Sequence, residues 1–409
     1  MWRRLFKFIQ LIAVTSILVT GCAVLSTPGI LPDGASSVEV PSEFHGDYIF
    51  VEGNIGNGDP IWLLLDTGFT STLLNPDIAN GLEVELTSGA MLIGAGEEAQ
   101  EGRLPDRELA VSLTGTPSYL TRVPVVDMTA IEPYIGRRFD GGVGGDFFSR
   151  YVVEIDYHQE RVIVHDPGRF RPDPEAERIP LTIMNNQPHV EAGIVLPDDQ
   201  IIRHYFMLDT GSDGSLILYE PFVRNHAILE RIPDAVPHRF GGIGGEVESR
   251  LIQIESIDVG PYRMHNIPTV LSLAESGLTT QDHSAGHLGT NILSRFRITF
   301  DYHSGMVYLT LQDEGDRVFP RASAGFNVKA DGPDLNQFVV YYVIEDTPAE
   351  QSGLQTGDRL IRVNGQSADQ YSLPEIDRMI RGEPGEQLEL EVERNGRTKT
   401  FVMDLEIRI

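Results

Sequence analysis

Cysteine and basic residues are both scarce in this sequence. Cys22 is the only cysteine among 409 residues, so the chain cannot form an intrachain disulfide, and its packing must stabilise it unaided. Only 32 Lys and Arg residues stand against 60 Asp and Glu residues, which gives a formal net charge of −28. A surface this acidic repels phosphate backbones, so we expect no nucleic acid among the partners. The acidity favours solubility and does not identify a substrate.

Length and composition favour a globular protein of several domains. A chain of 409 residues exceeds what one hydrophobic core usually organises, so two or three domains are expected. Hydrophobic residues make up 41 % and charged residues 22 %, which argues against general disorder. The chain also has 41 Gly and 25 Pro, and short apolar runs alternate with turn residues, so we predict a mostly β fold.

The first 22 residues resemble an export signal. Basic residues at Arg3, Arg4 and Lys7 precede an apolar run from Phe8 to Val19. The order Val19-Thr20-Gly21-Cys22 resembles a bacterial lipobox, which implies cleavage before Cys22, lipidation of its thiol and attachment to a membrane. A plain signal peptide and an uncleaved anchor are the alternatives.

We therefore expect an extracytoplasmic, membrane-anchored lipoprotein on the periplasmic side. Ala23 after the cysteine resembles lipoproteins of the outer membrane. Residues 23–43 are rich in Pro, Gly and Ser and predict a flexible tether.

Two β-rich blocks, residues 44–167 and 179–311, repeat the same landmarks in the same order. Leu63–Gly68 matches Phe206–Gly211, and Gly144–Tyr151 matches Gly289–Phe296. Between these landmarks each block has a glycine-rich turn, formed by Gly94, Ala95 and Gly96 in the first and by Gly242, Ile243, Gly244 and Gly245 in the second. The repeat predicts two homologous lobes, joined by a charged linker over residues 168–178.

The first landmark carries the chemistry, because each lobe has an Asp-Thr-Gly triplet after an apolar run. Peptide hydrolysis by an acid pair needs one carboxylate to accept a proton from water and one carboxyl to polarise the scissile carbonyl. Asp66 and Asp209 would supply this catalytic pair, and like charges about 3 Å apart share one proton. The supporting residues are Thr67, Gly68, Thr210, Gly211 and Ser212.

These motifs resemble the retropepsin-like and pepsin-like aspartic proteases. The resemblance implies an endopeptidase that needs no metal or organic cofactor and is active as a monomer, with Asp66 and Asp209 as catalytic residues and the two glycine turns as flaps. Two flaps resemble a fused retropepsin dimer, so we expect a cleft covered from both sides. The segments Gly142-Val143-Gly144 and His287-Leu288-Gly289 match the apolar-apolar-Gly element that follows in each half of the family. Phe69 departs from the family pattern, which has a small residue there, as at Ser212.

Other readings of these residues remain open. The fold could bind peptides without cutting them, or the chain could be an envelope scaffold. His158 and His303 follow matching Asp-Tyr pairs and are interpreted as echoes of the duplication, because neither has a His or Cys neighbour at metal-ligand spacing. His283 and His287, with Asp282, are interpreted as loop polarity.

Residues 321–409 change in character. Pro348 is predicted to open a short helix that Gly353 ends, Leu360–Val363 is a predicted strand, and a helix is expected over Leu373–Ile380. The segment from Asp346 to Gly365 resembles the PDZ family closely, which implies an α+β domain.

The PDZ resemblance implies a groove for a peptide or protein ligand beside a carboxylate-binding loop. Ala324, Gly325 and Phe326 would form that loop, although they depart from the Gly-Leu-Gly-Phe pattern common in the family. A PDZ fold that only packs on the protease is the alternative. Both aspartates and both flaps precede residue 312, so we expect the active site to be complete without this domain.

Overall fold

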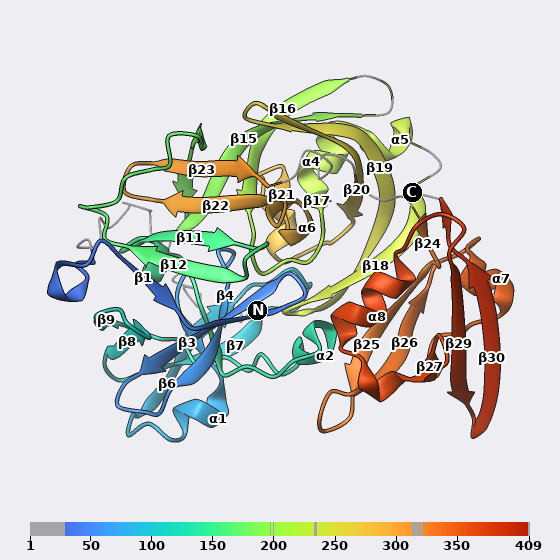
Figure 1. Cartoon of the computed structure of the whole chain (residues 1–409), viewed down its shortest axis with the longest axis horizontal. Helices are drawn as coiled ribbons and strands as arrows, with labels where there is room; N and C mark the ends of the chain where they lie inside the picture. Colours follow the sequence, from blue (N-terminus) through green and yellow to red (C-terminus); the bar gives the residue numbers. More distant parts are fainter. Residues whose placement is uncertain are drawn as a thin grey trace, which may run out of the picture.

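The computed structural model describes residues 29–407 except 197, 199, 233, 234, 313–318, 320 and 321. The predicted export signal, with Cys22, lies outside the described residues and stays a prediction. The chain is mostly β, as the sequence predicts, with two lobes and a C-terminal domain (Figure 1). In the part of the chain that the structure describes, no helix is long and apolar enough to cross a membrane.

The first lobe is built on a sheet of short apolar strands in the order β5-β10-β4-β3-β8-β9, with β2 paired to β3. These strands are β2 (Ser42–His45), β3 (Tyr48–Ile55), β4 (Ile61–Leu65), β5 (Leu73–Leu74), β8 (Leu109–Leu113), β9 (Tyr119–Thr121) and β10 (Gly141–Val143). A separate hairpin is formed by β6 (Leu86–Leu92) and β7 (Gln100–Pro105). The lobe also has the short helices η1 (Pro32–Gly34), α1 (Pro76–Ala79), α2 (Glu132–Ile135) and α3 (Gly145–Phe148).

The second lobe has an eight-stranded sheet in the order β14-β15-β16-β21-β17-β20-β19-β18. Its strands are β14 (Thr182–Met184), β15 (Gln187–Val195), β16 (Ile201–Leu208), β17 (Leu216–Leu218), β18 (Val236–Gly242), β19 (Gly245–Val259), β20 (Tyr262–Ser272) and β21 (Gly286–Leu288). Its helices are α4 (Glu220–Asn225), α5 (Ile228–Arg231), η2 (Leu278–Thr280) and α6 (Thr290–Leu293). Three neighbouring strands of the first lobe, β5-β10-β4, have the same pairing directions as β17-β21-β16 of the second lobe. The duplication seen in the sequence is therefore also present in the structure.

A third sheet joins the two lobes, in the order β1-β12-β11-β22-β23-β13. Its strands are β1 (Ser37–Val40), β11 (Val152–Asp156), β12 (Arg161–His165), β13 (Glu177–Pro180), β22 (Phe296–Asp301) and β23 (Met306–Leu311). The central pairing, β11 with β22, is between the two repeats. The ring of Phe148 on the first lobe packs 5.5 Å from Phe300 and 5.7 Å from Tyr302, and a buried aromatic ring of this kind contributes about 1.5–3 kcal/mol by burial.

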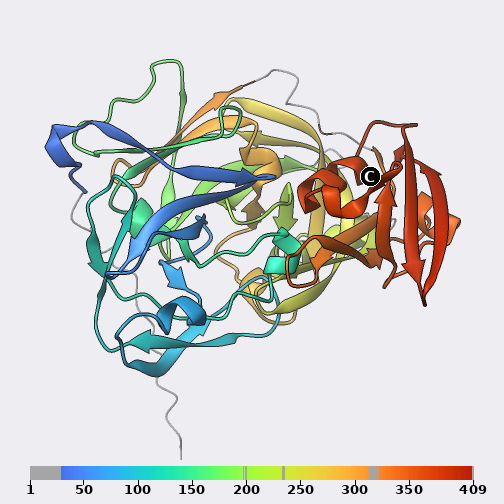
Figure 2. The same cartoon turned by 60° about the horizontal axis from the view of Figure 1, so that its bottom comes forward.

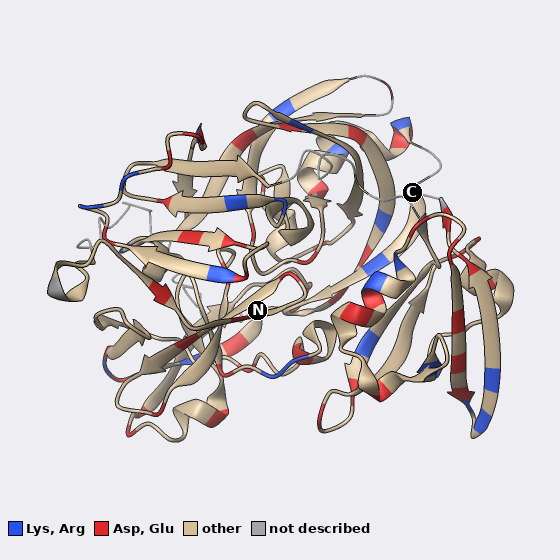
Figure 3. Ribbon diagram, in the orientation of Figure 1, with Lys and Arg blue, Asp and Glu red and all other residues tan. Residues whose placement is uncertain are grey.

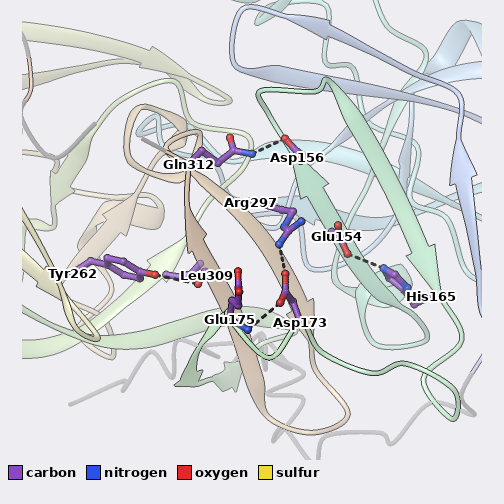
Figure 4. Close-up of polar contacts among 9 residues, drawn as sticks. All are labelled: Glu154, Asp156, His165, Asp173, Glu175, Tyr262, Arg297, Leu309 and Gln312. Carbon is purple, nitrogen blue, oxygen red and sulfur yellow. Dashed lines mark hydrogen bonds and ion pairs between the residues drawn. The ribbon is translucent and has the colours of Figure 1, made fainter. Parts of the chain in front are cut away.

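Polar contacts surround this shared sheet (Figure 4). The Gln312 side-chain amide donates to the Asp156 carboxylate at 2.6 Å, and the Tyr262 hydroxyl donates to the Leu309 carbonyl at 3.4 Å. Asp173, in the predicted linker, forms an ion pair with Arg297 on β22. The linker is therefore tied to the second lobe.

Two predicted boundaries differ from the structure. Residues 37–43 are not part of a flexible tether, because β1 pairs with β12 and the side chain of Val40 is buried. The linker likewise ends at residue 176, since β13 begins at Glu177 and pairs with β23. Both strands are only four residues long, so their alternation is too brief to distinguish from a loop in the sequence.

The C-terminal domain has a sheet in the order β25-β26-β27-β29-β30, with β28 on β27, and a two-stranded pair β24-β31. Its elements are β24 (Ala322–Ser323), β25 (Phe326–Asp331), β26 (Gln337–Val343), α7 (Pro348–Ser352), β27 (Arg359–Val363), β28 (Gln366–Ser367), η4 (Ala368–Gln370), α8 (Leu373–Ile380), β29 (Gln387–Arg394), β30 (Arg397–Asp404) and β31 (Glu406–Ile407). The predicted helix over Leu373–Ile380 is confirmed, and Gly353 ends α7 with a φ of +86°, as its position predicts. The buried residues of this domain form a core separate from that of the lobes.

The free edge of β25 faces the two lobes rather than away from them. β25 is the terminal strand of its sheet, and helix α2 of the first lobe packs against it. Figure 2 shows β25 and α8 on the side of the C-terminal domain that is turned toward the lobes. This orientation places the groove between β25 and α8 at the protease lobes.

Candidate active site

Two equivalent strands deliver Asp66 and Asp209 to the junction of the lobes. Strand β4 runs parallel to β10, and the backbone N–H of Asp66 donates to the Val143 carbonyl at 3.0 Å. Strand β16 runs parallel to β21, and the N–H of Asp209 donates to the Leu288 carbonyl at 2.9 Å. The apolar runs before each aspartate are buried, so each strand is fixed up to the residue before its carboxyl group.

The two threonines lock the lobes together directly behind the carboxyl groups. The Thr67 hydroxyl donates to the Leu208 carbonyl at 2.6 Å, and the Thr210 hydroxyl donates to the Leu65 carbonyl at 2.8 Å. In return, each hydroxyl accepts the backbone N–H of the other threonine at 3.0 Å. Both threonines are fully buried, so all these polar groups are satisfied by the opposite lobe.

The two carboxyl groups lie in one buried site. The N–H of Gly68 donates to Asp66 Oδ1 at 2.7 Å, and the N–H of Gly211 donates to Asp209 Oδ1 at 2.9 Å. A Cβ added to Gly211 would lie 2.1 Å from Asp66 Oδ2, and one added to Gly68 would lie 2.8 Å from Asp209 Oδ1. Each triplet's glycine therefore touches the opposite aspartate, and only a residue without a side chain fits there.

Burial raises the pKa of Asp66 well above that of an ordinary carboxyl group, and the charge of Asp209 raises it further. Both side chains are only 7 % exposed. Two carboxylates this close cannot both ionise easily, so the pair holds a proton at pH values where isolated aspartates have lost theirs. The site can thus offer a carboxylate and a carboxylic acid to the same bound group.

The two halves of the site differ at one pair of positions. The ring of Phe69 fills the space beside Gly142, where an added Cβ would lie 2.3 Å from the ring. In the second lobe the small residue Ser212 faces His287, with its Oγ 3.1 Å from Nε2. A large residue after the Asp-Thr-Gly triplet is thus matched by a glycine, and a small one by a large side chain.

The interpretation of His287 as loop polarity is wrong. Its ring is 2 % exposed in β21, and its Nδ1 lies 3.3 Å from the Tyr219 hydroxyl. Burial lowers the pKa of His287, which favours its neutral imidazole, and this ring holds the Ser212 hydroxyl. The sequence signal that could have found it was the register of His287-Leu288-Gly289 with Gly142-Val143-Gly144.

The predicted flaps meet over the cleft. The first is the tip between β6 and β7, which contains Gly94, Ala95 and Gly96; the second is the tip between β18 and β19, which contains Gly242, Ile243, Gly244 and Gly245. The Gly96 N–H donates to the Ile243 carbonyl at 2.9 Å, and the Glu98 N–H donates to the Gly244 carbonyl at 3.0 Å. A Cβ on Gly96 would lie 2.1 Å from the Gly244 carbonyl carbon, so this close approach of two backbones requires glycine.

The cleft below the flaps is a cavity of about 1830 Å³, and the C-terminal domain forms one of its walls. The lining residues from this domain lie on β24, β25, α8 and the adjoining loops, and they include Ser323, Gly325, Asn327, Leu373, Asp377 and Arg381. Gly325 of the predicted carboxylate-binding loop therefore shares a cavity with Asp66 and Asp209, whereas Ala324 and Phe326 are buried. The carboxyl pair and both flaps come from the two lobes, while β25 and α8 add a wall to the same cleft, so activity without the C-terminal domain stays a prediction.

Charged groups from all three parts of the chain meet at this wall. Asp47 lies in the turn between β2 and β3, Asp213 follows the second Asp-Thr-Gly triplet, and Asp377 and Arg381 come from α8 and its end. Figure 3 shows acidic and basic residues side by side on α8. Burial, with Asp213 as a second cause, raises the pKa of Asp47 to about 6. Burial also raises the pKa of Asp377 to about 6, although Arg381 opposes the shift.

We expect these two carboxyl groups to make the fold less stable as pH rises from 4 to 7. A group whose folded-state pKa is raised contributes its stability below the unfolded pKa, here 3.8, and loses it as pH rises through about 6. Asp47→Asn removes this titration. The free energy of unfolding of the variant minus that of the unmodified protein should therefore increase from pH 4 to pH 7. Urea unfolding at both pH values measures this difference. A difference that is constant or declines over this range would contradict the assignment, and Asp59→Asn, on the exposed turn before β4, is the control.

Within the described residues, no group of three or more His, Cys, Asp and Glu side chains is arranged to hold a metal ion. His158 lies in the turn between β11 and β12, and His303 lies in the equivalent turn between β22 and β23. The structure therefore places them as the duplication predicts.

Comparison with known proteins assigns the class of both parts of the chain. Residues 199–292 match the family model described as aspartyl protease, and residues 339–394 match the model described as PDZ domain. The first match contains Asp209, Ser212 and the second flap. The chain thus contains an aspartyl protease domain and a C-terminal PDZ domain.

Individual relatives match short parts of the chain. The Regulator of sigma-E protease RseP of Escherichia coli (strain K12) is 35 % identical over 83 residues, which are 20 % of this chain and 17 % of that protein. The protein of the same name from Salmonella typhimurium (strain 14028s / SGSC 2262) matches to the same extent. The match thus spans about a sixth of the length of these relatives. Among solved structures, a photosystem II D1 C-terminal processing protease is 24 % identical, with 22 % of this chain and 24 % of that chain covered and a TM-score of 0.20.

Proposed function

We propose that the protein is an aspartic endopeptidase that hydrolyses peptide bonds with Asp66 and Asp209. One observation carries the proposal: the two lobes present their carboxyl groups in one buried site, where the glycine of each triplet touches the opposite aspartate. A site that only bound peptides would have no need to bury two acidic groups against each other, because this arrangement costs desolvation and like-charge repulsion.

The chemistry follows from the single shared proton. In this proposal Asp66 holds the shared proton, and its carboxylic acid donates a hydrogen bond to the scissile carbonyl. Asp209, with the Ser212 hydroxyl and the buried His287 behind it, would accept a proton from the attacking water. The two flaps would cover the substrate and exclude bulk water from the site.

The PDZ domain would contribute to substrate binding. PDZ domains bind extended chains by adding a strand to a sheet edge, and the free edge of β25 faces the catalytic cleft. The bound chain would therefore be the one that is cut or a segment joined to it, which raises the effective concentration of the scissile bond at the aspartates. The substrate class is an extended polypeptide.

The location we propose rests on the sequence before residue 29. Cys22 would carry the lipid anchor, and the protein would act on the periplasmic side of a membrane as a monomer. Labelled lipid incorporated into the unmodified protein and absent from a Cys22→Ala variant is the expected result. Lipid in both proteins would contradict this assignment.

The proposed activity is tested by incubation of the protein with an unstructured polypeptide between pH 3 and pH 8. We expect cleavage that is strongest at acidic pH, because activity falls as the shared proton is lost. A transition-state analogue with a tetrahedral hydroxyl at the scissile position should block the cleavage, while a metal chelator and a serine-directed reagent should not. Binding of the polypeptide without cleavage at any pH would favour the alternative, a peptide-binding envelope protein.

A further inference from the structure

Tyr134 of helix α2 stands where both lobes and the PDZ domain meet. Its ring packs edge-on against Tyr341 of β26, with the ring centroids 5.4 Å apart and an interplanar angle of 85°. The ammonium group of Lys329, on β25, lies 5.3 Å from the centroid of the Tyr134 ring. An edge-on aromatic pair contributes about 0.5–1.5 kcal/mol beyond burial, so these contacts hold α2 to the PDZ domain.

The same side chain also reaches the second flap. The Tyr134 hydroxyl lies 3.1 Å from Oε1 of Glu246, which is the second residue of β19, directly after the flap tip. A Cβ added to Gly241 would lie 3.0 Å from the Tyr134 ring, so the ring lies directly against the flap backbone. Tyr134 comes from the first lobe, yet its partners are in the PDZ domain and in the flap of the second lobe.

The PDZ domain touches this flap at its base as well. The Tyr342 hydroxyl donates to the Pro237 carbonyl at 3.1 Å, at the start of β18. The Tyr342 ring lies 6.1 Å from the ring of His238, with an interplanar angle of 82°. The flap is therefore contacted by the PDZ domain directly at its base and through Tyr134 near its tip.

The contacts of Tyr134 with the second flap affect how the cleft is closed, because backbone carbonyls of the second flap accept the hydrogen bonds that join the two flap tips. Ile243 and Gly244 accept the N–H groups of Gly96 and Glu98, and both lie between Gly241 and Glu246, the two flap residues that Tyr134 touches. A shift of Tyr134 would move the flap backbone on either side of these carbonyls.

We propose that Tyr134 is a positioning residue that couples docking of the PDZ domain to closure of the second flap. With the PDZ domain docked, Tyr341 and Lys329 fix the Tyr134 ring, and the ring and hydroxyl hold Gly241 and Glu246 so that the flap tips can bond. A ligand strand that enters beside β25 would displace α2 and release the flap. The inference rests on the proposed function only in one respect, which is that substrate must pass the flaps to enter the cleft.

The coupling is tested by amide hydrogen exchange of segments 93–98 and 240–246 in the full-length protein without substrate. Tyr134→Ala removes both sets of contacts, and Tyr341→Ala removes the ring contact from the PDZ side without altering the flap. We expect each variant to raise the exchange rate of these segments about tenfold, and the double variant to raise it no further than the larger single effect. Tyr134→Phe keeps the ring and loses one hydrogen bond, so an increase of about threefold is expected.

Arg138→Ala is the matched control. Arg138 follows the same helix and donates to the Pro333 carbonyl of the PDZ domain at 2.6 Å, and none of its contacts among the described residues is with the flap. Its loss should raise flap exchange far less than Tyr341→Ala does, because the docking contact that it removes does not pass through Tyr134. The coupling would be overturned if the exchange rate of the flap segments rose in Tyr134→Ala but not in Tyr341→Ala. An equal rise in Arg138→Ala would also overturn it, as would an unchanged rate in Tyr134→Phe. Because exchange needs no turnover, a protein that fails to cut peptides would leave this result standing.

Discussion

Replacing Asp209 by Asn is expected to lower kcat/KM for a peptide substrate by on the order of 10²–10⁴-fold, because an amide cannot accept the proton of the attacking water. Asp66→Asn should cause a loss of the same order, since its amide cannot supply the acid proton. The two losses should not add, because the carboxyl groups act as one unit with one proton. Steady-state rates of the two single variants and the double variant measure this.

The control for these variants is stability. Asn keeps a side-chain oxygen that can accept the N–H of Gly68 or Gly211, and each variant also removes one of the two ionisable groups and with it the like-charge repulsion within the pair. We therefore expect a urea midpoint equal to or above that of the unmodified protein at pH 7. If either variant kept near-normal turnover, the shared-pair mechanism would be wrong.

Gly211→Ala is expected to reduce kcat/KM by about a hundredfold while the chain still folds. The new methyl group would lie 2.1 Å from Asp66 Oδ2, so the Asp66 carboxyl must move out of its position beside Asp209. Displacement of a reacting group by about 1 Å can cost a hundredfold in rate. The displaced carboxyl is the end of a side chain and not backbone, so the effect on the free energy of unfolding should be small beside the effect on rate.

Gly214→Ala in the same loop is the matched control for this variant. An added Cβ at Gly214 meets nothing closer than 3.9 Å, so we expect activity within a few-fold of the unmodified protein. Equal losses in the two variants would mean that the loop tolerates no side chain for reasons unrelated to Asp66. No loss in Gly211→Ala would contradict the geometry of the carboxyl pair.

The sequence predicted the parts of the site that repeat. The Asp-Thr-Gly triplets, the glycine turns and the apolar-apolar-Gly segments each occur twice in the same order, and a duplicated order constrains the pairing of distant residues. The pairing of Asp66 with Asp209 and a cleft covered by two flaps were predicted by combining the two copies, whereas the contact of Gly96 with Ile243 was not. The PDZ domain was predictable for another reason, because its helix and turn residues lie within one local segment.

The contacts between different parts of the chain could not be predicted in this way. The packing of β25 and α8 against the cleft, and of Tyr134 against Tyr341, joins residues that share no motif and occur once each. Nothing in the sequence marks Asp47 and Asp377 as unusual carboxyl groups, and their raised pKa values arise in the folded chain, where both line the cleft. His287 was misread because it was grouped with Asp282 and His283, whereas its ring lies in β21 and contacts Tyr219 and Ser212.

The two lobes differ at one pair of equivalent positions, with Phe69 and Gly142 in the first lobe and Ser212 and His287 in the second. This difference has a consequence for how such a protein can evolve. In an assembly of two identical chains, a substitution beside one aspartate is copied beside the other, so both halves of the reaction must tolerate it. Here each half is encoded separately, and the shared sheet of β11 and β22 keeps the halves together without identical sequences. A large residue and its matching glycine can therefore change in one half while the other keeps a hydroxyl beside its carboxyl group. The covalent link thus frees the two aspartates from two-fold symmetry, which would allow one to act as acid and the other as base in the proposed reaction.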